Sequence, residues 1–204
     1  MENKIQTIRK WLGQGSINVF GMPYAGKDTQ CQSLADLFGT EAMSGGHILR
    51  NSVIPEHARR LMDAGDLVPI DDYLNIVLPY LRGEQFNGKP LMLSSVGRWD
   101  GEQQGVLRAT EESHHPMKAV VLLTVDEDVA RRRHEQHVEL GDRGPRADDD
   151  PTVFENRLHE YHTKTEPVID FYRQKGLLIE VDGSPSPARV TEEILDELYR
   201  LASA

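Results

Sequence analysis

Short apolar runs alternate along this chain with longer segments whose apolar residues recur every three or four positions. The short runs are mostly bounded by glycine, proline or charged residues, as strands buried on both faces of a parallel sheet tend to be. The predicted strands are Ile17–Phe20, Leu91–Leu93, Val120–Val125 and Leu177–Val181, with a fifth and weaker strand at Glu41–Ser44.

The segments of helical period lie between these strands and predict helices. They are Ile5–Leu12, Thr29–Leu37, Asp71–Leu81, Asp128–Val138, Val153–Tyr172 and Ala188–Leu201. The stretch Gly141–Asp150 lacks periodicity and concentrates Gly, Pro and Asp, which favours a flexible surface loop. The alternation of strand and helix predicts an α/β fold with a central parallel sheet.

Composition narrows the possible classes of function. With 204 residues the chain can form one domain with a substantial core. Its formal net charge of −10 argues against nucleic acid or an anionic membrane surface as a partner. No stretch approaches the ~18 apolar residues of a membrane span and no leader sequence is evident, so we expect a cytoplasmic protein. A single cysteine, Cys31, excludes an internal disulfide framework.

The strongest chemical signal is a glycine-framed loop directly after the first predicted strand. Residues 21–30 read GMPYAGKDTQ and then open a helix. Such a loop points successive backbone N–H groups at one place, the helix N-terminus adds partial positive charge, and a lysine, here Lys27, reaches the outer phosphates of a nucleotide. Asp28 stands where the general motif has a hydroxyl residue, and the hydroxyl of Thr29 follows one position later.

Transfer of a phosphoryl group between two nucleotides needs several cations, because charge spreads over the equatorial oxygens of the transferring group. Arginine suits this task through its planar fork of donors. Arginines stand at the edges of predicted elements or in the predicted loop, at Arg50, Arg98, Arg133, Arg146 and Arg157. A single arginine is usually a solvated surface charge, so each of them alone is a weak signal.

The order of motifs resembles the adenylate kinase family from about Ile17 to the C-terminus. The family's G-x-P-G-x-G-K-G-T-Q is similar to GMPYAGKDTQ here, and its M-D-x-G-x-L-V-P is close to Met62–Pro69. Further segments that resemble family motifs are Ser44–Arg50, Ser94–Arg98, Pro145–Asp149 and Arg157–His162.

This resemblance implies one P-loop domain over residues 1–204, with a doubly wound, five-stranded parallel sheet flanked by helices. The core would comprise residues 1–43, 81–136 and 149–204, with a helical acceptor-binding insertion at about 44–80 and a short lid at about 137–148. The resemblance further implies that a monomer catalyses reversible, Mg²⁺-dependent transfer from ATP to AMP, giving two ADP.

The resemblance also implies roles for individual residues. ATP would contact Tyr24, Ala25, Gly26, Lys27, Asp28, Thr29, Arg133 and Pro185. AMP would contact Gly45, Arg50, Asp66, Leu67, Val68, Ser95, Arg98, Glu102 and Gln103. The residues expected to carry the transfer are Lys27, Arg98, Arg133, Arg146 and Arg157.

The chain departs from the family at the expected magnesium site. Two family carboxylates that hold water around Mg²⁺ fall at His47 and Ser94. We hypothesise that Asp28 recruits Mg²⁺ instead; the alternative is that its carboxylate only stabilises the helix N-terminus, by ~0.3–1 kcal/mol. His137 replaces another family arginine. The pair His134 and His137 could bind a metal, although a solvated helix face is the preferred interpretation.

The acceptor base is the least constrained feature. Gly45 replaces a family residue that contacts adenine, and the base-reading glutamine aligns with Glu102 or, after a one-residue slip, with Gln103. UMP or CMP therefore stay alternative acceptors. The changes at His47 and Ser94 leave a second alternative, a catalytically weak nucleotide-binding regulatory protein.

Overall fold

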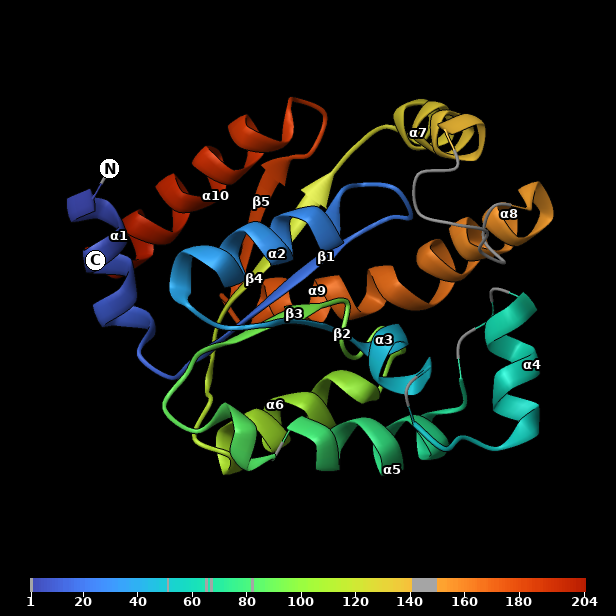
Figure 1. The fold of residues 1–204 in the computed structure, drawn as a ribbon, viewed down its shortest axis with the longest axis horizontal. Helices are drawn as coiled ribbons and strands as arrows, with labels where there is room; N and C mark the ends of the chain where they lie inside the picture. Colours follow the sequence, from blue (N-terminus) through green and yellow to red (C-terminus); the bar gives the residue numbers. More distant parts are fainter. Residues whose placement is uncertain (1, 51, 65, 67, 82, 141–149) are drawn as a thin grey trace.

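Five parallel strands form the centre of the molecule in a computed structural model that describes residues 2–50, 52–64, 66, 68–81, 83–140 and 150–204. The sheet order is β2-β3-β1-β4-β5 (Figure 1). The strands are β1 Ser16–Gly21, β2 Ala42–Ser44, β3 Leu91–Ser94, β4 Met117–Thr124 and β5 Leu178–Asp182. All five predicted strands are confirmed, and β4 begins three residues earlier than expected.

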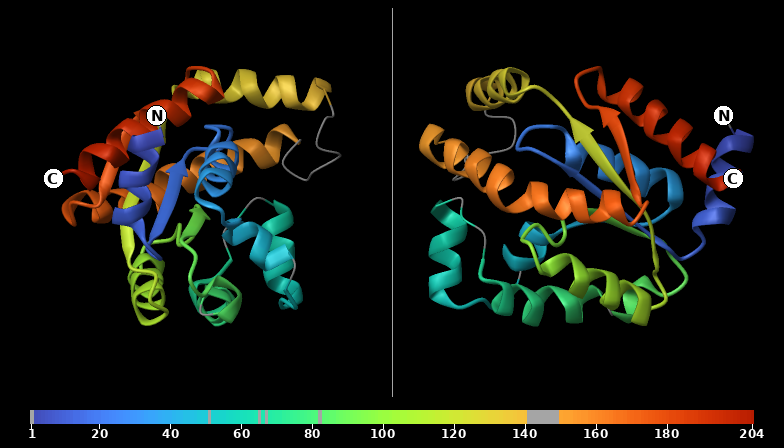
Figure 2. Two further views of the ribbon diagram at one scale, coloured as in Figure 1. Left: turned by 60° about the vertical axis from the view of Figure 1, so that its left-hand side comes forward. Right: turned by 180° about the vertical axis from the view of Figure 1, so that it is seen from behind.

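Helices cover both faces of this sheet, so the doubly wound α/β prediction is confirmed (Figures 1 and 2). The N-terminal half contains α1 Glu2–Leu12, α2 Lys27–Phe38, α3 Gly45–Arg50, α4 Glu56–Ala64, α5 Ile70–Leu81 and the 3₁₀ turn η1 Glu84–Phe86. The C-terminal half contains α6 Glu102–Glu112, α7 Glu127–Leu140, α8 Pro151–Glu160, the π-helical turn η3 Tyr161–Thr165, α9 Glu166–Gln174 and α10 Pro187–Ala202.

The strands read as continuous apolar runs because both of their faces are buried. In β4, Val121 and Leu123 pack with α1, α2 and α10, while Val120 and Leu122 pack with α5, α6 and α9 on the opposite face. Burial of each such side chain contributes ~1.5–3 kcal/mol. This two-sided burial explains why apolar runs located the strands without any polar alternation.

Apolar period predicted the helices less completely. Periodicity alone did not predict α3, α4 or α6, although the helical insertion expected at about 44–80 includes α3 and α4. The helix α3 has only six residues, and among the described residues of α4 only Ala58 is buried. The segment Val153–Tyr172 was predicted as one helix, but it contains α8, the π turn and α9. Pro167 lies at the start of α9 and has no N–H to continue the ladder, which accounts for the wider turn before it.

The connections between strands place one crevice at the carboxyl ends of the strands. From β1 the chain crosses to β2 on one side and returns through β3, whereas β4 and β5 lie on the other side. Ligands of open α/β sheets bind at such a switch point. Between β2 and β3 the described residues form α3, α4, α5 and the turn η1 (Figure 1). No described helix is long and apolar enough to span a membrane.

Candidate active site

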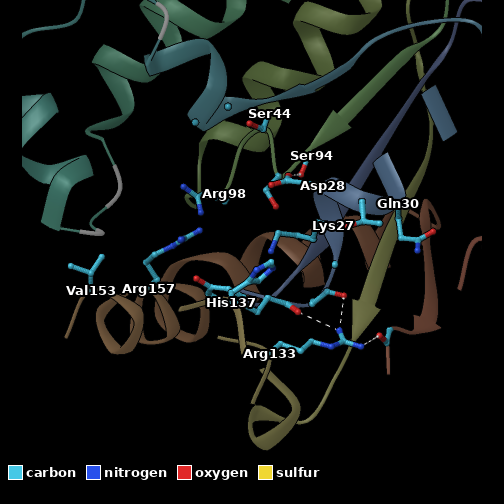
Figure 3. Close-up of a pocket in the computed structure, with 18 of the residues that line it drawn as sticks. Lys27, Asp28, Gln30, Ser44, Ser94, Arg98, Arg133, His137, Val153 and Arg157 are labelled. Carbon is cyan, nitrogen blue, oxygen red and sulfur yellow. Dashed lines mark hydrogen bonds between the residues drawn. The ribbon is translucent and has the colours of Figure 1, made fainter. Parts of the chain in front are cut away.

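A cavity of about 710 Å³ opens at the carboxyl ends of β1 and β3. Its wall combines the loop after β1, the turn after β3, the start of α3, parts of α7 and α8, and the turn before α10 (Figure 3). These segments are distant in sequence and meet only through the sheet. The cavity therefore gathers most of the described residues that the sequence singled out.

Backbone geometry shapes the loop between β1 and α2. Gly21 has φ 149°, and a Cβ there would come within 2.7 Å of the Leu123 carbonyl oxygen. Gly26, with φ 96°, precedes α2 in the left-handed region. Positions of this kind favour glycine, which has no Cβ. They let the N-terminus of α2 approach the cavity, where its partial positive charge would stabilise an anion.

Lys27 lies on the floor of this cavity. Its Nζ donates a hydrogen bond to the Met22 carbonyl oxygen at 2.7 Å. Desolvation lowers the pKa of Lys27 to about 7; Asp28 opposes this shift, and Arg157 and Arg98 add to it. A cation in this position is stabilised once anionic oxygens enter the cavity.

Arg98 and Arg157 face the same space as Lys27, although they come from the turn after β3 and from α8 (Figure 3). Desolvation and then the neighbouring Arg157 lower the pKa of Arg98, while Tyr73 and Glu102 oppose this shift. Three cationic side chains thus surround one volume. Their mutual repulsion favours binding of a group with several negative oxygens.

Arg133 joins two walls of the cavity. From α7 its guanidinium donates to the carbonyl oxygens of Tyr24 at 3.3 Å and Ala25 at 3.4 Å. It also donates to those of Gly183 at 2.8 Å and Ser184 at 3.1 Å (Figure 3). Pro185 lies in the same wall. This arginine holds the phosphate loop against the turn that follows β5.

Asp28 and Ser94 form a direct pair across the cavity rim. The Ser94 hydroxyl donates to Asp28 Oδ1 at 2.6 Å. Asp28 is exposed in the wall, and Ser94 occupies the place of one family carboxylate. His47, at the place of the other, is exposed on α3 and is absent from the described cavity wall. The carboxylate that pairs with the end of β3 thus comes from the start of α2.

The structure brings together only some of the residues that were expected to bind the acceptor. Gly45, Asp66, Val68, Ser95 and Glu102 line the cavity. Arg50 ends α3, whereas Leu67 and Arg146 fall outside the described residues, as does the expected lid from residue 141 onward.

Glu102 and Gln103, the two candidates for the base-reading position, differ in their place relative to the cavity. Gln103 is buried away from the described cavity wall, where it accepts from the Gly101 N–H at 2.6 Å and donates to Asp100 at 2.8 Å. Glu102 lines the cavity and accepts from the Trp99 N–H at 3.0 Å. Burial raises the pKa of Glu102 to about 7, against the opposing effects of the Trp99 and Arg98 backbone and the Arg98 charge.

The structure places two further residues in contact with the site, where sequence patterns did not place them. Tyr73 is buried in the cavity wall, and its hydroxyl oxygen accepts from the Gly97 N–H at 2.6 Å. The predicted helix over residues 71–81 contained this residue without any chemical signal. The preferred interpretation, which placed His134 on a solvated helix face, is wrong. His134 is buried, and its ring stacks on that of Phe154 with 4.4 Å between the ring centroids. Among the described residues no group of three or more His, Cys, Asp or Glu could hold a metal ion.

Comparison with known proteins agrees with this architecture. Residues 19–177 match a family model described as adenylate kinase. An adenylate kinase of Leptospira biflexa is 33% identical over 185 residues, covering 87% of this chain and 96% of the relative. Adenylate kinases of Synechococcus sp. (36% over 179 residues; 85% and 93%) and Agrobacterium fabrum (34% over 192 residues; 90% and 97%) are similar. The chain therefore belongs to the adenylate kinase family and is a phosphotransferase of the adenylate kinase type.

Proposed function

We propose that the protein transfers the terminal phosphoryl group of Mg²⁺-bound ATP to AMP reversibly, giving two ADP, and that it acts as a monomer. One observation carries the proposal: Lys27, Arg98 and Arg157, from three distant segments, line one cavity at the switch point of the sheet. A triphosphate and a monophosphate brought together need such a cluster of cations, and a single chain supplies it.

The donor phosphates fit the loop between β1 and α2. Backbone N–H groups at the start of α2 and the Lys27 ammonium would contact the β- and γ-phosphates. Arg133 and Pro185 would flank the donor base, since both belong to the wall that the phosphate loop shares with the turn after β5. Lys27 becomes fully protonated in this complex because the phosphates offset its desolvation.

The acceptor would occupy the side of the cavity formed by the turn after β3 and by α3. Arg98 would bind its phosphate, and Gly45, Asp66 and Val68 would line its remaining surface. A Cβ at Gly45 would approach the Tyr73 hydroxyl to 3.0 Å, so a side chain there would displace the wall. The absence of a side chain at Gly45 therefore leaves the Tyr73 hydroxyl in its place.

Positioning and charge account for the transfer itself. An oxygen of the AMP phosphate is already an anionic nucleophile, so no general base is required. A bond forms between this oxygen and the γ-phosphorus as the bond to the bridging β–γ oxygen breaks. Lys27, Arg98 and Arg157 would stabilise the charge on the equatorial oxygens, and exclusion of water would prevent hydrolysis.

The residues present fit a water-mediated magnesium site. Mg²⁺ prefers carboxylate and water oxygens and is often bound through one or two carboxylates plus substrate phosphates. Asp28 offers an exposed carboxylate on the cavity wall, oriented by Ser94. When bound, Mg²⁺ supplies charge neutralisation at the β- and γ-oxygens. Asp28 would orient its water shell from the start of α2.

A coupled assay with AMP, UMP, CMP, GMP and dTMP as acceptors tests the proposal. We expect AMP to give the highest kcat/KM with MgATP. A clear preference for UMP or CMP would replace the acceptor assignment. Tight ATP binding without ADP formation at any Mg²⁺ concentration would favour the regulatory alternative.

The role of Asp28 needs its own measurement. Asp28→Asn removes the charge and keeps the side-chain shape, so we expect the Mg²⁺ concentration for half-maximal rate to rise about tenfold. An unchanged Mg²⁺ requirement would remove Asp28 from the metal shell. Binding of Mn²⁺ to the enzyme–ATP complex, followed by electron paramagnetic resonance, gives a readout independent of turnover.

A further inference from the structure

Tyr24 occupies an unusual backbone conformation in the phosphate loop. Its φ of 60° lies in the left-handed region, where a bulky side chain is rare because the Cβ crowds the backbone. In the family motif quoted above, this position is glycine, which adopts such angles readily. A tyrosine therefore persists here only if its surroundings hold it.

The surroundings of Tyr24 are aromatic. Its ring centroid lies 5.2 Å from that of His134, 5.7 Å from that of His137 and 5.6 Å from that of Phe154. His134 in turn stacks on Phe154 with an interplanar angle of 12°. We call these four rings the aromatic cluster. Edge-to-face and stacked contacts of this kind fix rings relative to one another.

The aromatic cluster links the phosphate loop to the two helices that carry arginines. In α7, Arg133 directly precedes His134 and donates to the Tyr24 carbonyl oxygen. In α8, Arg157 lies three residues after Phe154, close to the same helix face. The carbonyl group and the ring of Tyr24 thus attach the phosphate loop to α7, and the same ring attaches it to α8.

We propose that Tyr24 is a positioning residue for the donor side of the reaction. Its ring holds the phosphate loop, Arg133 and Arg157 in one arrangement before the nucleotide binds. Donor affinity then benefits because less order must be imposed on binding, and turnover benefits because small misplacements of charged groups slow transfer strongly. The expected effect on kcat rests on the proposed function. The expected effect on the Kd for MgATP requires only that the protein binds ATP.

Two substitutions separate the ring from the backbone conformation. Tyr24→Gly and Tyr24→Asn both tolerate a positive φ but lack the ring. We expect each to raise the Kd for MgATP, measured by calorimetry, about tenfold and to lower kcat about tenfold, with the KM for AMP changed less than about threefold. Tyr24→Phe restores the ring without the hydroxyl and should recover ATP affinity to within about twofold of wild type.

Two further variants test whether the effect is specific to this tyrosine and whether it survives a failure of Tyr24→Gly to fold. Tyr199→Ala removes a partly exposed tyrosine from α10, outside the described cavity wall, and should leave both constants unchanged. If Tyr24→Gly does not fold, Phe154→Leu tests the same cluster from α8 and should raise the Kd for MgATP about fivefold. In a double-mutant cycle, Tyr24→Gly and His134→Ala should be less than additive.

The proposal fails if the glycine and asparagine variants bind MgATP within about twofold of wild type, or if Tyr24→Phe is as impaired as Tyr24→Gly. A wild-type protein that binds ATP but forms no ADP would overturn the proposed function instead. The Kd comparison among the variants would still decide the role of the ring.

Discussion

At the scale of single residues, Lys27 couples nucleotide binding to protonation. In the free protein its pKa is about 7, so at pH 8 about nine-tenths of these side chains are neutral. Donor phosphates favour the charged form, and binding therefore takes up nearly one proton per ATP at pH 8. At pH 6 about nine-tenths of these side chains are already protonated, so the contribution of Lys27 falls to about one-tenth of a proton.

This prediction is measured by calorimetry of MgATP binding in buffers of different ionisation enthalpy. The wild type at pH 8 should show a buffer-dependent heat that corresponds to nearly one proton. Lys27→Met should lose that dependence, because it has no titrating group. Equal proton uptake by both proteins would contradict the assignment of the shifted group to Lys27.

Glu102 gives a second residue-scale prediction, for stability. Its pKa is raised to about 7 from an ordinary value near 4.5, so the folded state binds more protons than the unfolded state between these values. The stabilisation from this protonation is complete below about pH 4.5 and is lost as pH rises through about 7. Glu102→Gln carries no such penalty and should be more stable than wild type at pH 8, by roughly 1–3 kcal/mol.

Urea denaturation at pH 5 and pH 8 checks the sign of this effect. The advantage of Glu102→Gln should shrink markedly at pH 5. Glu111→Gln, an exposed position on the same helix, serves as the matched control and should show little difference at either pH. A Glu102→Gln protein that is equally destabilised at both values would disprove the argument.

At the scale of elements, α8 connects the core to the insertion between β2 and β3. Asn156 Nδ2 donates to the Ala64 carbonyl oxygen at 3.0 Å and to Asp66 Oδ1 at 2.7 Å. These bonds attach the end of α4 to α8, the helix that carries Arg157. The two helices lie side by side (Figure 2). The two sides of the cavity are thus joined directly, besides their connection through the sheet.

Asn156→Ala removes both bonds and should loosen α4. At about 0.5–1.5 kcal/mol per bond, amide hydrogen exchange within residues 56–64 should accelerate about tenfold. The KM for AMP should rise severalfold, because Asp66 lines the expected acceptor side. Asn75→Ala, at an exposed position of α5, is the control. Unchanged exchange in α4 would show that these bonds do not hold the helix.

At the scale of the whole molecule, a cluster of three basic side chains lines a cavity in a chain of formal net charge −10. The surrounding negative charge repels anions at long range, whereas Lys27, Arg98 and Arg157 attract them locally. Specific polyanions should therefore bind by geometry and not by net charge.

Inorganic tripolyphosphate should stabilise the folded protein through this cavity. At 100 times its Kd it should raise Tm by roughly 5–10 °C, because it binds the folded state alone. NaCl at equal ionic strength should give a much smaller change, since it only screens charges. Arg157→Gln should reduce the shift with tripolyphosphate. Thermal melts that show the same shift for both salts would rule out a specific site.

The sequence by itself determined the features that depend on local order. Apolar runs located the strands because both faces of the sheet are buried, and the glycine spacing located the phosphate loop because its backbone angles need glycine. The order of motifs also identified the family. These features depend on residues that are neighbours in the sequence, so they could be predicted without knowing the order of the strands in the sheet.

Only the tertiary structure decided which distant side chains meet. Asp28 and Ser94 are 66 positions apart, yet they bond because β1 and β3 are adjacent strands. The same arrangement placed Glu102 in the cavity and Gln103 outside its described wall, and it buried His134 against Phe154. Such contacts depend on strand order and helix rotation, which many residues fix together and no local pattern records.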